Sequence, residues 1–193
     1  MSDRIRHVAE PCENESASAA RGSAVVLLRE FALIAVLFLG ASTEVLAADA
    51  SRHAEVAERG SQVMPFALDR TTHIFTKTSV GGVQQVVAKN AADASQISMI
   101  RMHLSQIASA FAHGDFAGPT HIHGADMPGL AELKSAKPGS VLIRYSDIQS
   151  GGQIEYTTKN ANLRSAIHAW FDAQVSDHGA DAMAGHDHMQ HRE

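Results

Sequence analysis

The feature that most constrains the fold is a pattern that occurs twice along the chain. In each copy a β-branched run, a Gly-Gly pair, a second such run, a Lys-Asn pair and a long amphipathic segment follow one another. The Gly-Gly pairs at 81–82 and 151–152 are typical of tight hairpin turns, because glycine adopts positive φ without steric cost. The pattern predicts two ββα units, that is, an α+β fold in which an antiparallel sheet carries two long helices packed on one face.

The two amphipathic segments are predicted to be helices with one buried face each, because their apolar residues recur at spacings of three and four. The first is expected to begin after Asp93 or Ser95 and the second after Asn160 or Asn162, since such side chains cap helices. The buried stripes are predicted to be Ile97, Ile100, Leu104, Ile107 and Phe111, and Leu163, Ile167, Trp170, Phe171 and Val175.

The N-terminal residues are typical of an export signal. The apolar run FALIAVLFLG at 31–40 follows several arginines and precedes V-L-A at 45–47, a small-residue cleavage signature. Residues 1–47 are therefore predicted to be a signal peptide with a long n-region, which makes the mature protein periplasmic or secreted. An uncleaved anchor and a buried helix are the alternatives, although the run is much shorter than the roughly 20 residues of a membrane-spanning helix. Cleavage would remove Cys12, the only cysteine.

The rest of the chain divides into three parts. Residues 48–60 are polar and alanine-rich and are predicted to be a flexible lead-in, with a short helix as the alternative. Residues 61–179 are predicted to form a single α+β domain that contains both ββα units. Residues 180–193 have almost no large apolar side chains and are predicted to be a disordered tail rich in histidine and methionine.

Composition and motifs exclude several classes of function. The net charge of -5 and the aromatic content of 5% give no basic stripe, so no nucleic-acid partner is expected, and no membrane contact is expected after signal cleavage. The chain contains none of the nucleophile-elbow, Walker, zincin or dinucleotide-binding motifs. A binding protein is therefore favoured over an enzyme, although Asp115, Asp126 and Glu132 lie close enough in sequence to histidines for acid–base chemistry.

Histidine is the residue type that carries chemistry here, with 12 copies. The H-x-H at His121 and His123 would place both rings on one face of an extended segment, and neutral imidazole is a common ligand of zinc and copper. Two ligands do not complete a site, so His73 in the first strand and His103 beside the buried stripe of the first helix are further candidates. The alternative is that these histidines are solvent-exposed loop residues or boundary residues of the core.

The tail HDHMQH is a second candidate for metal binding. Flexible tracts rich in histidine bind copper, nickel or zinc with modest affinity, and Met183 and Met189 would favour copper(I). His186, His188 and His191 are the predicted, weaker ligands. A solvated polar tail is the alternative.

Five segments together resemble a known group of proteins. TTHIF, IRMHLSQIASAFAHGDF, IHGADMPG, GGQIEYTT and AIHAWFDAQVSDH occur in this order. They are similar to the pattern of a group of short exported bacterial proteins of unknown function, over about residues 59–181. Some members are labelled aspartate carbamoyltransferase, but the S-T-R-T phosphate loop of such enzymes is missing here. Where the group has a second histidine in two of these motifs, this chain has Ile74 and Gln106.

The resemblance picks out His73, His103, His123, His168 and His178, together with Asp115 and Asp177, and the five histidines are the candidate metal ligands. His121, His113 and the tail histidines are outside the pattern.

The leading hypothesis is an exported domain that binds a transition metal, copper, zinc or nickel, for sequestration or delivery. The alternatives are a structural or partner-binding periplasmic module and a small hydrolase that uses a metal-bound water or a His/Asp pair.

Overall fold

The computed structural model describes residues 47–186 of the 193-residue chain. The predicted signal peptide, apart from its last residue, therefore lies outside the described residues, as do His188 and His191 of the tail. The described residues from 49 onwards belong to one compact unit, and all contacts below lie within it.

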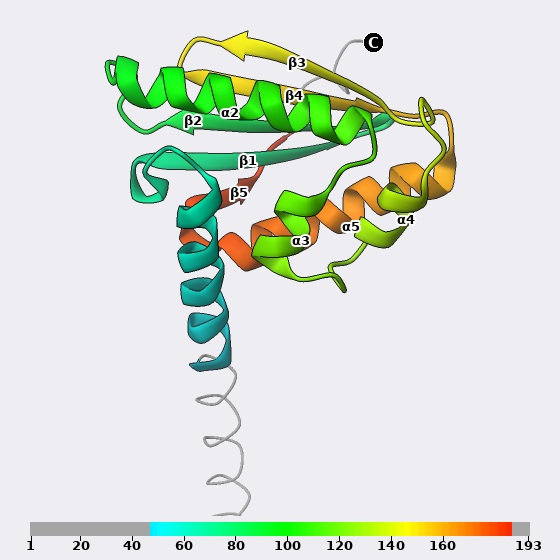
Figure 1. Cartoon of the computed structure of the whole chain (residues 1–193), viewed down its shortest axis with the longest axis horizontal. Coiled ribbons are helices and arrows are strands. Elements are labelled where there is room, and N and C mark those ends of the chain that lie inside the picture. Colours follow the sequence, from blue (N-terminus) through cyan, green and yellow to red (C-terminus); the bar gives the residue numbers. More distant parts are fainter. Residues whose placement is uncertain (1–46, 187–193) are drawn as a thin grey trace, which may run out of the picture. The chain divides into compact units, whose positions relative to one another are not determined.

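The structure is an α+β fold, as predicted (Figure 1). A helical segment at 47–63 precedes the first strand. The following elements are η1 (Leu68–Arg70), β1 (Thr71–Thr78), β2 (Gly81–Ala88), α2 (Ala94–Ala112), α3 (Ala117–His123), α4 (Leu130–Ser135), β3 (Leu142–Ile148), β4 (Gly151–Thr157), α5 (Ala161–His178), η2 (Gly179–Asp181) and β5 (Ala182–Ala184). The two strand, strand, helix sequences are thus β1-β2-α2 and β3-β4-α5, with α3 and α4 between them.

One five-stranded sheet combines the strands of both units in the order β3-β4-β2-β1-β5. The hairpins β1–β2 and β3–β4 are antiparallel, and β2 joins them by pairing antiparallel with β4. The sequence pattern predicts a purely antiparallel sheet. The sheet is mixed instead, because β5 pairs in parallel with the outer edge of β1. The chain reaches that edge from the end of α5, which returns it in the direction of β1.

The two Gly-Gly pairs do not form the hairpin turns, contrary to prediction. Each pair begins the returning strand, and the turn residues are the pair just before it. A Cβ at Gly81 would lie 1.9 Å from the carbonyl oxygen of Tyr156, and one at Gly151 would lie 1.9 Å from that of Val86. The glycines are therefore explained by the close approach of β2 and β4 to each other.

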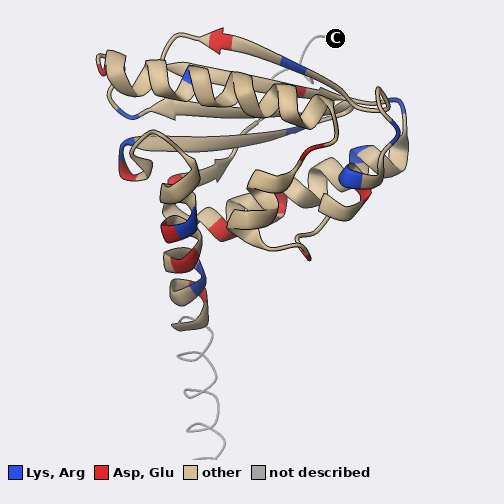
Figure 2. Ribbon diagram, viewed as in Figure 1, with Lys and Arg blue, Asp and Glu red and all other residues tan. Residues whose placement is uncertain are grey.

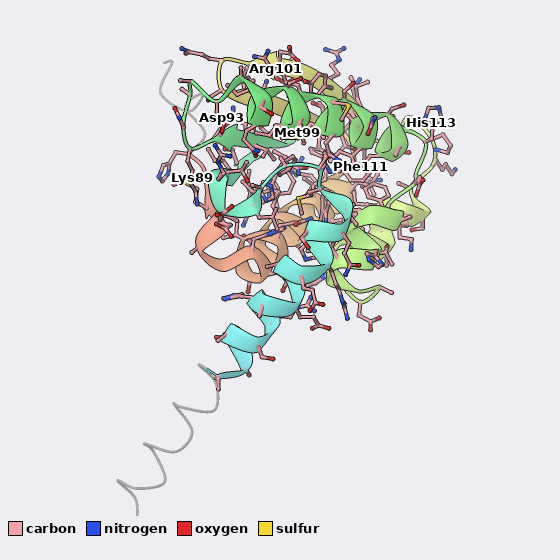
Figure 3. All side chains as sticks on the ribbon, turned by 60° about the vertical axis from the view of Figure 1, so that its left-hand side comes forward. Lys89, Asp93, Met99, Arg101, Phe111 and His113 are labelled. Atoms are coloured by element: carbon pink, nitrogen blue, oxygen red, sulfur yellow. The ribbon has the colours of Figure 1, made fainter. Side chains whose placement is uncertain are left out.

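The caps of the two long helices agree with one of each pair of predicted positions. The Asp93 side chain accepts a hydrogen bond from the backbone of Gln96 at the start of α2, and Asn160 accepts two at the start of α5. Helix α2 contacts β4, β3 and β2, whereas α5 contacts β1, β2 and β5. Figure 3 shows Asp93 and His113 at opposite ends of α2, with Phe111 near its C-terminal end.

The lead-in is helical rather than flexible. Residues 48–60 fall within the helix at 47–63, where Val56 is only 1% exposed and belongs to the apolar core. Glu55 pairs with Arg59 one turn later, a spacing that supports a surface helix. The sequence left a flexible lead-in and a short helix open, because one buried valine and a few charged pairs give little periodic signal.

Part of the tail is ordered as well. Of residues 180–193, predicted to be disordered, Ala182–Ala184 form β5 and pair with β1 from His73 to Phe75. This strand is held by backbone hydrogen bonds at a sheet edge, which an apolar-residue pattern does not report. Residues 187–193 lie outside the described part of the chain.

Charged side chains are unevenly placed. Figure 2 shows several of both signs on the helix at 47–63, whereas α2 contains one, Arg101. In the described residues, no helix combines the length and the apolar character needed to cross a membrane.

Gly129 allows α4 to begin against α5. It adopts φ +75°, and a Cβ there would lie 2.0 Å from the carbonyl oxygen of Ala166. Replacement by alanine is expected to lower the free energy of unfolding by at least about 2 kcal/mol, because left-handed backbone alone costs about 1–2 kcal/mol with a Cβ. Urea unfolding at neutral pH measures this.

The control is Gly118→Ala in α3, where a Cβ meets nothing within 4 Å. Alanine should be tolerated there within about 1 kcal/mol, since it favours helix. An equal effect of both substitutions would contradict the packing argument.

Candidate metal centre

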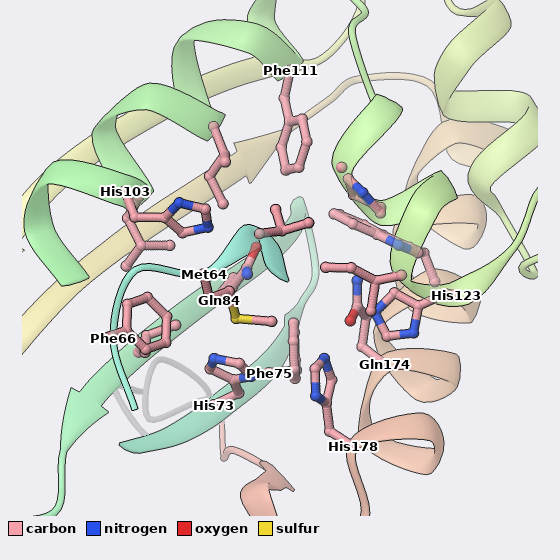
Figure 4. Close-up of a pocket in the computed structure, with 18 residues that line it drawn as sticks. Met64, Phe66, His73, Phe75, Gln84, His103, Phe111, His123, Gln174 and His178 are labelled. Carbon is pink, nitrogen blue, oxygen red and sulfur yellow. The ribbon is translucent and has the colours of Figure 1, made fainter. Parts of the chain in front are cut away.

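Four of the five predicted histidines line one cavity of about 60 Å³ between the sheet and the helices α2, α3 and α5. His73 comes from the middle of β1, His103 from α2, His123 from the last residue of α3 and His178 from the last residue of α5. Figure 4 shows their rings around the same space, with His103 on the α2 side and His178 beside His73. Four separate elements thus bring together residues that are up to 105 positions apart (178 − 73).

The ring of His178 contacts two of the other three histidine rings edge to face. The ring centroid of His178 lies 4.8 Å from that of His73 and 5.0 Å from that of His123. His103 is separated from them by Phe66, whose centroid lies 5.7 Å from His103 and 6.2 Å from His73. The core of the site is therefore the cluster of His73, His123 and His178, which we call the inner cluster.

The walls of the cavity are mostly apolar, and they leave two polar atoms unsatisfied. Met64, Phe66 and Phe75 lie around the inner cluster. Among the described residues, His73 Nδ1 and Trp170 Nε1 are buried without a hydrogen-bond partner. A buried polar atom without a partner is costly, so these two atoms indicate a place where a bound group would complete the structure.

The histidines of the cavity are held in the neutral form. Burial, with the neighbouring rings of His103 and His123, lowers the pKa of His73 to about 4. Burial also lowers the pKa of His103, and burial with the adjacent histidine rings lowers the pKa of His178 well below its usual value. The pKa of His123 is lowered too, because burial outweighs the nearby carboxylate of Asp177. Neutral imidazole offers the lone pair that metals bind.

A carboxylate fixes the orientation of one ring of the inner cluster. His123 Nδ1 donates to Asp177 Oδ2 at 2.8 Å, since an ionised carboxylate only accepts. Arg52 donates to both oxygens of Asp177, at 2.6 and 3.1 Å, and to the carbonyl oxygen of His123 at 2.7 Å.

These hydrogen bonds have two consequences for the site. Burial would raise the pKa of Asp177, but its bonds to Arg52 and His123 outweigh burial and lower it. The proton of the His123 ring is therefore kept on Nδ1, and Nε2 carries the lone pair. This arrangement of carboxylate, imidazole and free ring nitrogen is the one found behind metal-bound histidines.

His168 does not join the cavity, contrary to prediction. Its Nε2 donates to the carbonyl oxygens of Gly81 at 2.8 Å and Thr78 at 3.1 Å, which ties α5 to the β1–β2 turn. It lies ten residues before His178 in the same helix, about 15 Å along the axis. Its role is structural.

The H-x-H segment is helical rather than extended. His121 and His123 lie in α3, where residues two apart point to different sides, so His121 is exposed while His123 is 5% exposed. The acidic residues considered for acid–base chemistry, Asp115, Asp126 and Glu132, are all exposed and do not line the cavity. His186, the described histidine of the tail, is exposed too and lies on the outer side of the sheet with Ile74.

Three residues of the site were not predicted from the sequence. Arg52 lies in the segment predicted to be flexible, and Gln84 and Gln174 lie at positions that a strand or helix pattern assigns simply to the core. Gln84 is held by an accepted hydrogen bond from Tyr156 Oη at 2.8 Å. Glutamines at buried positions of otherwise apolar faces are the one pattern that could have indicated a polar cavity.

The rings of the inner cluster do not yet converge on one point. In the described residues, no group of three histidine, aspartate or glutamate side chains has the geometry to hold a metal ion as it stands. Coordination would require rotation of the His73 and His178 rings about their side-chain bonds into the adjacent cavity.

Comparison with known proteins adds no assignment: no family model, no curated protein and no solved structure matches the chain.

Proposed function

We propose that this protein binds one first-row transition-metal ion, copper, zinc or nickel, through His73, His123 and His178, and that it sequesters or delivers the ion outside the cytoplasm. The observation that carries the proposal is the contact of the His178 ring with the rings of His73 and His123, three neutral imidazoles from three separate elements in a cavity with unsatisfied polar atoms. A buried ring nitrogen without a partner, such as His73 Nδ1, costs free energy, and a bound ion that uses its lone pair would offset that cost.

The donor set fits these metals by its chemistry. Imidazole nitrogen suits copper, zinc and nickel, whereas magnesium and calcium prefer oxygen ligands. Asp177 and Arg52 supply the outer hydrogen bonds that orient His123 and keep its Nε2 deprotonated. The cavity of about 60 Å³ has room for the ion, the ring rotations and one or two water molecules.

The remaining predicted ligands take secondary places in this proposal. His103 lies behind Phe66 and contributes a neutral ring to the cavity wall rather than to the inner cluster. The tail histidines at 186, 188 and 191 act as a low-affinity collector. Export follows from the apolar run at 31–40 and its cleavage signature.

Titration of the purified full chain with Cu²⁺, Zn²⁺ and Ni²⁺, followed by calorimetry and by metal analysis after dialysis, tests the proposal. One ion per chain is expected to remain after dialysis. The triple variant with His186, His188 and His191 changed to asparagine separates the tail from the cavity. If that variant retains no metal, the folded domain has no metal role and the proposal fails.

A second function is favoured by the His123–Asp177 pair alone. A histidine whose Nδ1 donates to a carboxylate and whose Nε2 faces an apolar cavity has the arrangement of a general base. The cavity would then accept a small uncharged substrate. Turnover that persists in chelator and disappears in His123→Gln would support this function over metal binding.

Asp177 offers a direct test of the outer hydrogen bonds. Asp177→Asn is expected to weaken metal binding by about 10–100-fold, because an amide can donate its N–H to His123 and favour the wrong tautomer. Calorimetric titration with Zn²⁺ measures the change.

The matched control is Asp172→Asn, on the exposed side of the same helix, where the carboxylate pairs with Lys77. Its affinity should equal that of the unaltered chain. Equal affinities of the two variants would show that Asp177 does not orient a ligand.

A further inference from the structure

A second cavity adjoins the inner cluster and opens toward the surface. It has a volume of about 290 Å³ and is lined by His53 and other residues of the N-terminal helix, by Leu68 of η1, and by the end of α5 and the segment after it, which includes Asp181. In the described part of the chain, His178 is the one residue that lines both this outer cavity and the inner one. The ring of His178 therefore separates a cleft that solvent reaches from the buried site.

The inner cluster lies among apolar walls. His73 and His123 are each 5% exposed, and the other walls are largely apolar side chains such as Met64 and Phe75. A hydrated cation loses its water ligands only where others replace them, and an apolar wall offers none. The passage lined by His178 is the one that supplies a ligand on both sides.

The outer cavity contains a fixed histidine of its own. His53 Nε2 donates to the carbonyl oxygen of Ser176 at 2.8 Å, since a carbonyl can only accept, so Nδ1 is the ring nitrogen that this bond leaves for a ligand. Gly179 makes room for the ring, because a Cβ there would lie 2.9 Å from His53 Nδ1. The helix at 47–63 thus holds an imidazole beside the end of α5.

The charges around His53 and His178 suit a cation. Asp181 provides a carboxylate in the same cavity and receives one hydrogen bond, from Lys89 Nζ at 3.3 Å. His53 is one of the neighbours that lower the pKa of His178. The cavity therefore offers two imidazoles and a carboxylate, a donor set found in sites for borderline metal ions, and their side chains would have to move together because no three such groups in the described residues have the geometry to hold an ion as they stand.

We propose that the outer cavity is a loading site, in which His53, Asp181 and His178 first hold the transition-metal ion and His178 then carries it to His73 and His123. This inference rests on the proposed function and adds the route to it. In the transfer, the bonds of the metal to His53 Nδ1 and Asp181 break while bonds to His73 and His123 form. His178 stays bound throughout, and no proton moves because each imidazole binds the ion through a ring-nitrogen lone pair.

Trp170 allows the arrival of the ion to be timed. It is the only tryptophan of the chain and it lines the inner cavity, so quenching of its fluorescence by Cu²⁺ reports occupation of the inner cluster. Stopped-flow mixing of the full chain with Cu²⁺ gives the rate, and equilibrium titration gives the affinity. His53→Gln is the test variant, since the glutamine amide can still donate to Ser176.

His53→Gln is expected to slow quenching by at least about tenfold and to leave the equilibrium affinity unchanged. A residue that acts only on the route changes the on-rate and the off-rate by the same factor, so their ratio stays the same. The control His121→Gln removes an exposed histidine that lines neither cavity and should match the unaltered chain. Quenching at an unchanged rate in His53→Gln overturns the loading site while metal binding itself stands. Loss of affinity at an unchanged rate overturns it too, because His53 would then be a final ligand. An unaltered chain that binds no Cu²⁺ refutes the proposed function instead.

Discussion

Replacement of His178 by phenylalanine is expected to weaken the binding of Zn²⁺ and Cu²⁺ by more than about 100-fold, beyond the effect of losing an outer hydrogen-bond partner. His178 contacts both other rings of the inner cluster, so its removal leaves His73 and His123 without the ligand between them. Phenylalanine fills nearly the same volume and suits the apolar walls, so the fold should be retained. Calorimetric titration and metal analysis measure the loss.

Two measurements make this result specific. Thermal unfolding without metal should show that His178→Phe is as stable as the unaltered chain or more so, because a neutral imidazole has been replaced by an apolar ring. His168→Phe, in the same helix but outside the cavity, should retain metal binding. Full metal binding by His178→Phe would contradict the assignment of the inner cluster.

Acid is expected to destabilise the metal-free protein by about 3 kcal/mol between pH 7 and pH 4 through His73 alone. Its pKa is lowered to about 4 in the folded chain, against 6.5 for an ordinary histidine. The unfolded chain therefore takes up a proton as the pH falls below 6.5, while the folded chain does not until about pH 4. The contribution of His73 to the free energy of unfolding is therefore fully present above pH 6.5 and is lost as the pH falls from 6.5 to about 4.

The groups that face His73 act in the same direction. His103 from α2, His123 from α3 and His178 from α5 all have lowered pKa values, so each adds to the loss. Urea unfolding in chelator at pH 7, 5.5 and 4 measures the slope. His73→Phe should flatten the profile by about 3 kcal/mol over this range, since it removes the proton acceptor. An unchanged slope in that variant would show that His73 is protonated in the fold.

The two ββα units could be predicted because their periodicity is local. The alternation of β1 and the stripe of α2 from Ile97 to Phe111 are properties of consecutive residues, and burial follows them. β5 could not be predicted, because its three residues are held by the backbone of a strand about a hundred positions away. The helix at 47–63 was only an alternative for a similar reason, since it is tied to α5 by the side chains of Arg52 and His53 rather than by an apolar stripe.

The site was partly predictable for a different reason. The family resemblance marked His73, His103, His123 and His178, and these four line the cavity. It also marked His168, which helix geometry carries about 15 Å from His178. The positions of histidines in a sequence do not show which of them lie close together in space. The fold decides this, because it places β1, the end of α3 and the end of α5 side by side.

The Arg52–Asp177 pair joins residues 125 positions apart, at the first and the last helices of the domain. A ribosome must therefore finish α5 before Asp177 and Arg52 can orient His123, so a partly synthesised chain lacks the proposed metal centre. A protease that nicks the N-terminal helix would undo the same linkage without touching any of the three imidazoles. Metal retention in such a nicked protein would then report on the integrity of the chain's two ends.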